Sequence, residues 1–136
     1  MRLALSVVAT VLAVAASATA STKPVAFYGC RAIGPHPAPL VRPTSMIVAC
    51  ADANFYLTGI RWTGWTSAGA TGTGTGHQND CTPYCAAGHF HTYRVAVTLS
   101  KPRACKGRTV FVHVGWRYVA GRPVGVARAD GLDFPC

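Results

Sequence analysis

The sequence predicts an all-β fold: a disulfide-stabilised antiparallel β-sandwich or Greek-key barrel that follows a cleaved signal peptide. Three observations predict this class. Two segments alternate apolar and polar residues with a period of two, 14 Gly and 9 Pro interrupt the chain throughout, and six cysteines occur in 136 residues. A chain of this length forms one domain, with too little sequence for a large enzyme.

The first predicted element is a signal peptide at residues 1–20. Arg2 precedes an uncharged stretch from Leu3 to Ala20, which ends in small residues. The stretch only reaches the length of roughly 18 residues that a membrane span needs, and Ser21 follows it rather than a basic flank. We therefore expect cleavage after Ala20, export, and no membrane span in the mature chain.

Residues 21–43 are predicted to be an extended N-terminal segment, and residues 44–136 the single β domain. Pro35, Pro37 and Pro39 lie in the first of these segments. Proline fits neither the interior of a helix nor a central strand, so we expect ordered structure to begin near Thr44.

Two paired strands are expected at the start of the β domain. The apolar run at 45–51 contains Ile47 and Val48, and residues 55–62 form the second strand. Asp52 and Asn54 between them are typical of a turn.

Residues 69–76 alternate Gly and Thr and are predicted to form a strand with one smooth face. Trp62 or Trp65 could lie across that face. A phosphate-binding loop is the alternative, but the Lys-Ser/Thr pair and helix of such a loop are missing.

The strongest alternation occurs at residues 89–99 and 108–118. In the second segment, the apolar residues form one unbroken face: Val110, Val112, Val114, Trp116 and Tyr118. The turn-rich residues 101–107 between the two segments predict a hairpin or a crossover between sheets.

All six cysteines lie beyond the predicted cleavage site, which favours three disulfides formed in an oxidising compartment. They are Cys30, Cys50, Cys81, Cys85, Cys105 and Cys136. Six cysteines allow 15 pairings, and the sequence does not choose among them.

A metal site is a weaker interpretation of His77, Cys81, Cys85 and His89, which are spaced four residues apart. On a helix they would share one face and match a structural zinc site. Pro83 argues against such a helix, so we expect no metal and no cofactor, with His77 and His89 as the alternative ligands.

No catalytic residues are predicted, and we expect a protein that is not an enzyme. The chain has four Asp and no Glu, and no serine lies in a Gly-x-Ser-x-Gly motif.

The charge is one-sided: 13 Lys and Arg stand against 4 acidic residues, and no carboxylate occurs between Cys81 and Ala129. A basic half attracts anionic partners. The residues predicted to bind an anion are Arg94, Lys101, Arg103, Lys106, Arg108 and Arg117.

Several motifs resemble those of a group of small secreted actinobacterial proteins of uncharacterised function. They are Cys-x-Asp-x-Asn from Cys50, Trp-x-x-Trp from Trp62, and Asn-x-Cys-x-Pro-x-Cys-Ala from Asn79. The resemblance covers residues 46–99, and it implies export and a shared disulfide-supported core. It implies no catalytic residues.

These observations predict a secreted, non-enzymatic binding or envelope-associated protein whose partner is an anionic cell-envelope polymer or an extracellular protein. The alternative is a secreted inhibitor of extracellular proteases that presents residues 82–84 on a rigid loop. Single-stranded nucleic acid fits an exported protein poorly. Carbohydrate binding by Trp62 and Trp65 would require exposed rings.

Overall fold

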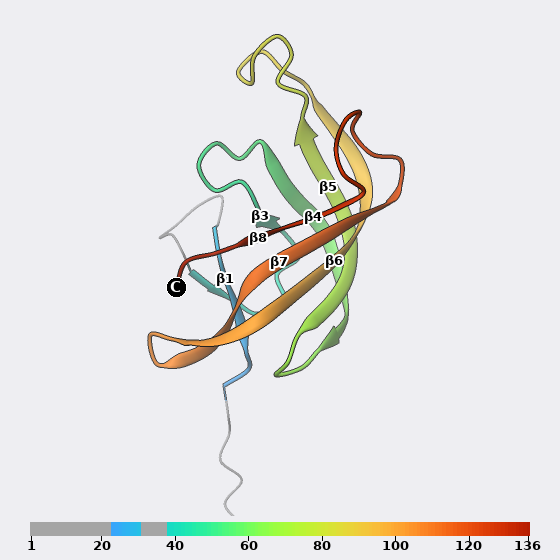
Figure 1. The fold of residues 1–136 in the computed structure, drawn as a ribbon. Helices are drawn as coiled ribbons and strands as arrows, with labels where there is room; N and C mark the ends of the chain where they lie inside the picture. Colours follow the sequence, from blue (N-terminus) through green and yellow to red (C-terminus); the bar gives the residue numbers. More distant parts are fainter. Residues whose placement is uncertain (1–22, 31–37) are drawn as a thin grey trace, which may run out of the picture.

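The computed structural model describes residues 23–30 and 38–136, so the predicted signal peptide lies outside the described residues. Within them the chain forms eight strands and no helix (Figure 1). The strands are β1 (Ala26–Gly29), β2 (Ala38–Leu40), β3 (Met46–Ile47), β4 (Phe55–Trp65), β5 (Ala70–Asn79), β6 (Phe90–Cys105), β7 (Arg108–Ala120) and β8 (Ala129–Asp133). The described residues hold no helix with the length and apolar character that crossing a membrane requires.

The strands form one curled sheet in the order β2-β1-β7-β6-β5-β4-β3, and β8 also pairs with β7. This confirms the prediction of a disulfide-stabilised all-β fold. The pairing is mixed rather than purely antiparallel, because β1 runs parallel to β7. A parallel pair needs a long connection, and the whole of β2 to β6 lies between these two strands in the sequence.

The sheet begins earlier than residue 44, where the sequence placed the start of order. β1 lies between β2 and β7, and all four of its residues are buried. Phe27 packs edge-on against Phe134, with ring centroids 4.9 Å apart. The prediction was wrong here because Pro39 lies on the edge strand β2, where a missing N–H is tolerated, while Pro35 and Pro37 lie outside the described residues.

The sheet curls so far that β3, at its far edge, lies beside the end of β1. The Ile47 amide of β3 donates to the Cys30 carbonyl at 3.5 Å, and Cys30 forms a disulfide with Cys50. At the other end of β1, the Trp65 indole Nε1 donates to the Val25 carbonyl at 2.9 Å. Apolar side chains therefore fill the inside of the curl, and a smaller buried cluster lies on the opposite side of the sheet at β1 and the start of β7.

The alternation in β6 predicts its burial correctly from Val95 to Leu99, where the odd-numbered side chains are buried and Thr98 is exposed. The smooth face of β5 is also confirmed. A Cβ on Gly72 would lie 3.1 Å from Cε3 of the Trp62 ring, so the glycine allows this indole to lie against β5.

The prediction of one unbroken apolar face in β7 is wrong at the start of that strand. Val110 and Val112 pack in a separate cluster with Tyr28, whereas Phe111 and Val114 belong to the main core. The reason is a change of neighbour along one strand: β1 pairs with β7 at residues 110–111, and β8 pairs with it at residues 113–117.

Three disulfides are present, as predicted, and the structure selects their pairing. The bonds are Cys30–Cys50, Cys81–Cys85 and Cys105–Cys136, which leaves no free cysteine. The first ties β1 to the turn after β3, the second closes the loop between β5 and β6, and the third ties the C-terminus to the end of β6.

Candidate functional site

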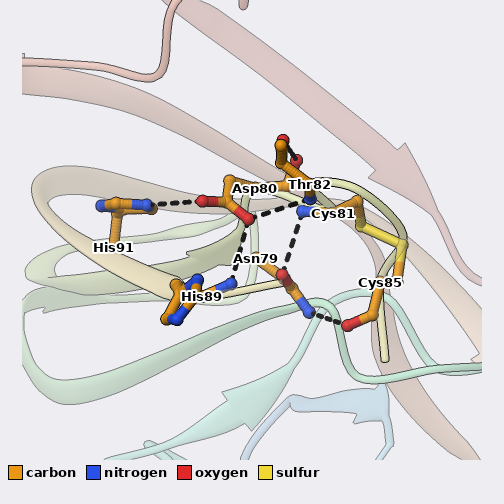
Figure 2. Close-up of polar contacts among 7 residues, drawn as sticks. All are labelled: Asn79, Asp80, Cys81, Thr82, Cys85, His89 and His91. Atoms are coloured by element: carbon orange, nitrogen blue, oxygen red, sulfur yellow. Dashed lines mark hydrogen bonds and ion pairs between the residues drawn. A yellow bond between two sulfur atoms is a disulfide. The ribbon is translucent and has the colours of Figure 1, made fainter. Parts of the chain in front are cut away.

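The loop between β5 and β6 is organised around the carboxylate of Asp80 (Figure 2). Its Oδ1 accepts hydrogen bonds from the backbone amides of Thr82 and His89, and its Oδ2 lies 3.0 Å from Nε2 of His91. The amide of His89 first, and then the His91 ring, lower the pKa of Asp80 well below its ordinary value near 3.8. This carboxylate therefore stays ionised and holds both sides of the loop together.

Asn79 anchors the base of the same loop. Its side-chain amide donates to Asn54 Oδ1 at 2.9 Å and to the Cys85 carbonyl at 2.8 Å, while its Oδ1 accepts the Cys81 amide. A Cβ on Gly88 would lie 2.9 Å from Asp80 Oδ1. The loop is thus fixed by side chains as well as by the disulfide, and it presents Tyr84, whose side chain is 63% exposed.

The structure of this loop argues against the set of metal ligands considered from the sequence, His77, Cys81, Cys85 and His89. Cys81 and Cys85 are bonded to each other, so neither supplies a thiolate to an ion. His77 instead lies on β5, where its Nε2 bonds to the Thr58 hydroxyl at 2.8 Å. Among residues 23–30 and 38–136, no group of three or more His, Cys or Asp side chains is placed to hold a metal.

Four of the predicted anion-binding residues lie at the end of the β6–β7 hairpin, which we call the hairpin end: Lys101, Arg103, Lys106 and Arg108. Three of these four have partners within the protein. The Lys101 ammonium lies 2.9 Å from both carboxylate oxygens of Asp133, and Arg108 donates to the Pro24 carbonyl at 2.9 Å. Lys106 lies 5.4 Å from the centre of the Tyr28 ring.

The other two predicted residues, Arg94 and Arg117, lie at the opposite end of the hairpin on the solvent side of the sheet. A third arginine, Arg61, joins them there. In the register of the sheet, Arg61 of β4 is opposite Thr73, Thr73 is opposite Ala96, and Ala96 is opposite Arg117. With strands about 4.8 Å apart, the Cα atoms of Arg61 and Arg117 are roughly 14 Å apart across this row.

We call this solvent side of β4 to β7 the outer face. Arg94 points to it because the neighbouring Val95 is buried, and it lies diagonally from Arg117, two residues before Ala96. Hydroxyl groups fill the space between the arginines. The exposed or half-exposed threonines of the outer face are Thr58, Thr63, Thr71, Thr73, Thr75, Thr92 and Thr98.

The arginines of the outer face form no ion pair in the described residues. All four Asp of the chain are in the described residues, and the ion pairs there are His91–Asp80, Lys101–Asp133 and His113–Asp133. Arg61, Arg94 and Arg117 take part in none of these. The sequence missed Arg61 because Asp52 and Asp80 are close to it in the chain, whereas the structure engages both carboxylates with other groups.

Three rings, which we call the aromatic platform, lie beside these arginines on the outer face: Tyr56, His77 and Phe90. Tyr56 stacks on His77 with ring centroids 4.5 Å apart and planes at 5°, and its ring is 5.4 Å from that of Phe90. Phe90 is 47% exposed. The sequence did not predict this platform, because its rings come from three strands.

A hollow of about 640 Å³ borders the platform on the side of β3. Tyr56 and Thr58 line one wall, and Leu40, Pro43 and Met46 contribute to the others. Tyr56 therefore joins the aromatic platform to this hollow, and the row from Thr58 through Thr75 to Arg94 runs beside the platform.

A histidine–carboxylate pair lies where β8 crosses β7. His113 Nδ1 shares a hydrogen bond with Asp133 Oδ1, the carboxylate that also binds Lys101. Its ring lies against Gly131, where a Cβ would be 2.7 Å from His113 Nε2. Ser100 is opposite His113 in the register, but no hydrogen bond in the described residues joins the Ser100 hydroxyl to the ring.

The two tryptophans considered for carbohydrate binding are engaged inside the fold. Trp62 donates its indole N–H to the Pro43 carbonyl at 2.9 Å, and Trp65 donates its own to Val25. Both rings pack against the core and meet each other edge-on, with ring centroids 4.9 Å apart.

No protein family, curated protein or solved structure was found to match the chain.

Proposed function

We propose that the protein is a secreted, non-enzymatic binding protein that attaches to an anionic polymer of the cell envelope through its outer face. The observation that carries the proposal is the set of three arginines, Arg61, Arg94 and Arg117, on one face without an ion pair in the described residues. Three disulfides support an oxidising compartment outside the cytoplasm.

This proposal keeps Arg94 and Arg117 from the set of residues predicted from the sequence, adds Arg61, and leaves out the four residues of the hairpin end. The outer face, rather than the hairpin end, supplies the binding charges, because Lys101, Lys106 and Arg108 have partners within the protein. Binding through several exposed charges weakens as salt screens them. A polymer with repeated negative groups gains from all three arginines at once.

The test is co-sedimentation of the oxidised protein with purified envelope from a Gram-positive cell, across a salt series. The variant Arg61→Gln/Arg94→Gln/Arg117→Gln should lose binding by at least about tenfold at low salt. A matched control, Lys23→Gln/Arg103→Gln/Lys106→Gln, removes the same charge from exposed positions elsewhere and should bind nearly as well as the wild type. Equal loss of binding in both variants would show that net charge alone governs binding. Unchanged binding by the triple arginine variant would refute the proposal.

Protease inhibition is the second candidate, and it is favoured by the loop around Asp80. A binding loop that is already rigid loses little entropy when it meets an active site. Here two side chains, a disulfide and Gly88 hold the loop while Tyr84 is exposed. Titration against extracellular proteases of each class tests it: the wild type should inhibit at micromolar concentration and Tyr84→Ala should not. Inactivity against all classes would remove this candidate.

A further inference from the structure

We infer that the anionic polymer is a polysaccharide that carries carboxylate groups, and that the aromatic platform stacks on its sugar rings while Arg94 binds a carboxylate. This inference rests on the proposed function and names the class of ligand for the same outer face. Three features carry it: the exposure of Phe90 in the platform, the position of His77 beside Arg94, and the hollow that Tyr56 borders.

The platform is a rigid surface rather than a set of loose side chains. Tyr56 is directly opposite His77 in the register and stacks on its ring, and the Thr58 hydroxyl fixes His77 through Nε2. Phe90 extends this surface at the end of β6, where it is 47% exposed. Tyr56 and His77 cover each other's facing surfaces, so the half-exposed ring of Phe90 supplies the apolar surface, and the C–H side of a sugar ring is a flat partner for it.

Charge lies directly beside the platform. His77 is opposite Thr92, and Arg94 follows two residues later on the same face, which places the two side chains diagonally across neighbouring strands. The planar guanidinium of arginine matches a carboxylate through two parallel hydrogen bonds. The threonines between the arginines add hydroxyl groups, which both donate and accept hydrogen bonds as sugar hydroxyls do.

The hollow gives a linear polymer room to continue beyond the platform. Tyr56 and Thr58 belong both to the platform region and to the wall of this hollow of about 640 Å³. Small-ligand sites have volumes of roughly 300 to 1,000 Å³. A chain of sugars could therefore place one unit in the hollow, stack the next on the platform and extend toward Arg94 and Arg117.

The compartment favours a polysaccharide over a nucleic acid. Three disulfides support a location outside the cytoplasm, which fits an envelope polysaccharide better than a nucleic acid. Single-stranded nucleic acid also stacks on aromatic rings, so the experiment includes it as a competitor.

The experiment measures binding of four probes by calorimetry: a short oligogalacturonate, its methyl ester, inorganic polyphosphate and oligo-dT. Phe90→Ala should weaken oligogalacturonate binding by about three- to tenfold through lost stacking, and should leave polyphosphate binding unchanged. Leu132→Ala is the matched control, because Leu132 is 42% exposed on β8, away from the platform. The methyl ester, which has lost its carboxylates, should bind at least about tenfold more weakly than the acid.

The outcomes separate this inference from the proposed function. If Phe90→Ala binds oligogalacturonate as the wild type does while the triple arginine variant loses it, the platform inference is wrong and the proposed function stands. If the triple variant keeps all its binding, the proposed function is wrong. Equal affinity for the acid and its ester would refute the inference that Arg94 binds a carboxylate of the polymer. A Phe90-dependent affinity for oligo-dT without affinity for oligogalacturonate would assign the face to nucleic acid instead.

Discussion

The hairpin end and the outer face are both basic, but their charged groups have different environments. At the hairpin end, Lys101 binds Asp133 and Arg108 binds the Pro24 carbonyl, so these side chains connect separate parts of the chain. On the outer face, Arg94 and Arg117 are exposed and belong to no ion pair of the described residues. The comparison teaches that basic side chains close together in sequence can stabilise the fold, while those brought together by strand pairing stay available to a partner.

The largest expected effect comes from opening the hairpin end. Cys105→Ser/Cys136→Ser removes a disulfide between residues 31 apart in sequence, which ties the C-terminus to the end of β6. Loss of a native disulfide from a small domain typically costs about 2 to 5 kcal/mol. Urea unfolding should show this loss, while envelope binding by the folded variant stays unchanged.

The matched control is Cys81→Ser/Cys85→Ser, because that disulfide joins residues only 4 apart. A short closed loop constrains the unfolded chain less, and the hydrogen bonds of Asn79 and Asp80 still hold this loop in the variant. The control should therefore lose less stability. An equal loss in both variants would show that loop length does not govern the effect.

A smaller effect separates the two regions by single arginines. Arg108→Ala removes a hydrogen bond to Pro24 and the packing of a half-buried stem, and should cost about 1 to 2 kcal/mol of unfolding free energy. Arg94→Ala should change stability by no more than about 0.5 kcal/mol. Envelope binding should respond in the opposite order, with Arg94→Ala the weaker binder. If Arg94→Ala unfolded at a lower urea concentration than Arg108→Ala, the assignment of Arg108 to stability and of Arg94 to binding would be wrong.

The sequence predicted the strands that have a local pattern, and it missed those that depend on pairing with distant parts of the chain. Period-two alternation is a local property, so it predicted β6 and most of β7, and the Gly-Thr repeat predicted β5. β1 and β8 were missed. β1 has only four residues, and β8 carries Asp130 and Asp133 in place of an apolar pattern, so both depend on pairing with β7.

The candidate site was predicted only in part for the same reason. Arg94 and Arg117 alternate with buried neighbours, and this local signal marked them as exposed. Nothing local shows that Lys101 meets Asp133, which is 32 residues away in the chain. The row from Arg61 to Arg117 depends on the register of four strands, as the aromatic platform depends on three, and register is a property of the folded sheet.

Lys101→Ala tests whether the ion pair of the hairpin end matters to the fold. Both side chains of the pair are more than half exposed, so the loss should be no more than about 1 kcal/mol and should shrink as salt is added. Urea unfolding at low and high salt measures it. Because Lys101 is already neutralised by Asp133, envelope binding should not change, and a binding loss as large as that of Arg94→Ala would return Lys101 to the binding surface.

The smallest expected effect is the part of the acid dependence of stability that the hairpin end contributes, separate from the part that Asp80 contributes in the loop between β5 and β6. Lys101 first, and then His113, lower the pKa of Asp133 below its ordinary value near 3.8. A carboxyl group with a lowered pKa binds its proton more weakly in the folded state than in the unfolded state, so its stabilising effect is complete above the unfolded pKa and is lost as pH falls through the folded one. Asp133→Asn should therefore reduce the loss of unfolding free energy as the pH falls below about 4, measured by urea unfolding at a series of pH values.

Two control variants should leave the slope of unfolding free energy against pH nearly unchanged. Asp130→Asn removes a carboxylate without an ion pair among the described residues, and Arg94→Ala changes the outer face. If either of these two variants flattened the slope as much as Asp133→Asn, acid sensitivity would reflect the net charge of the protein rather than the paired charges of the hairpin end.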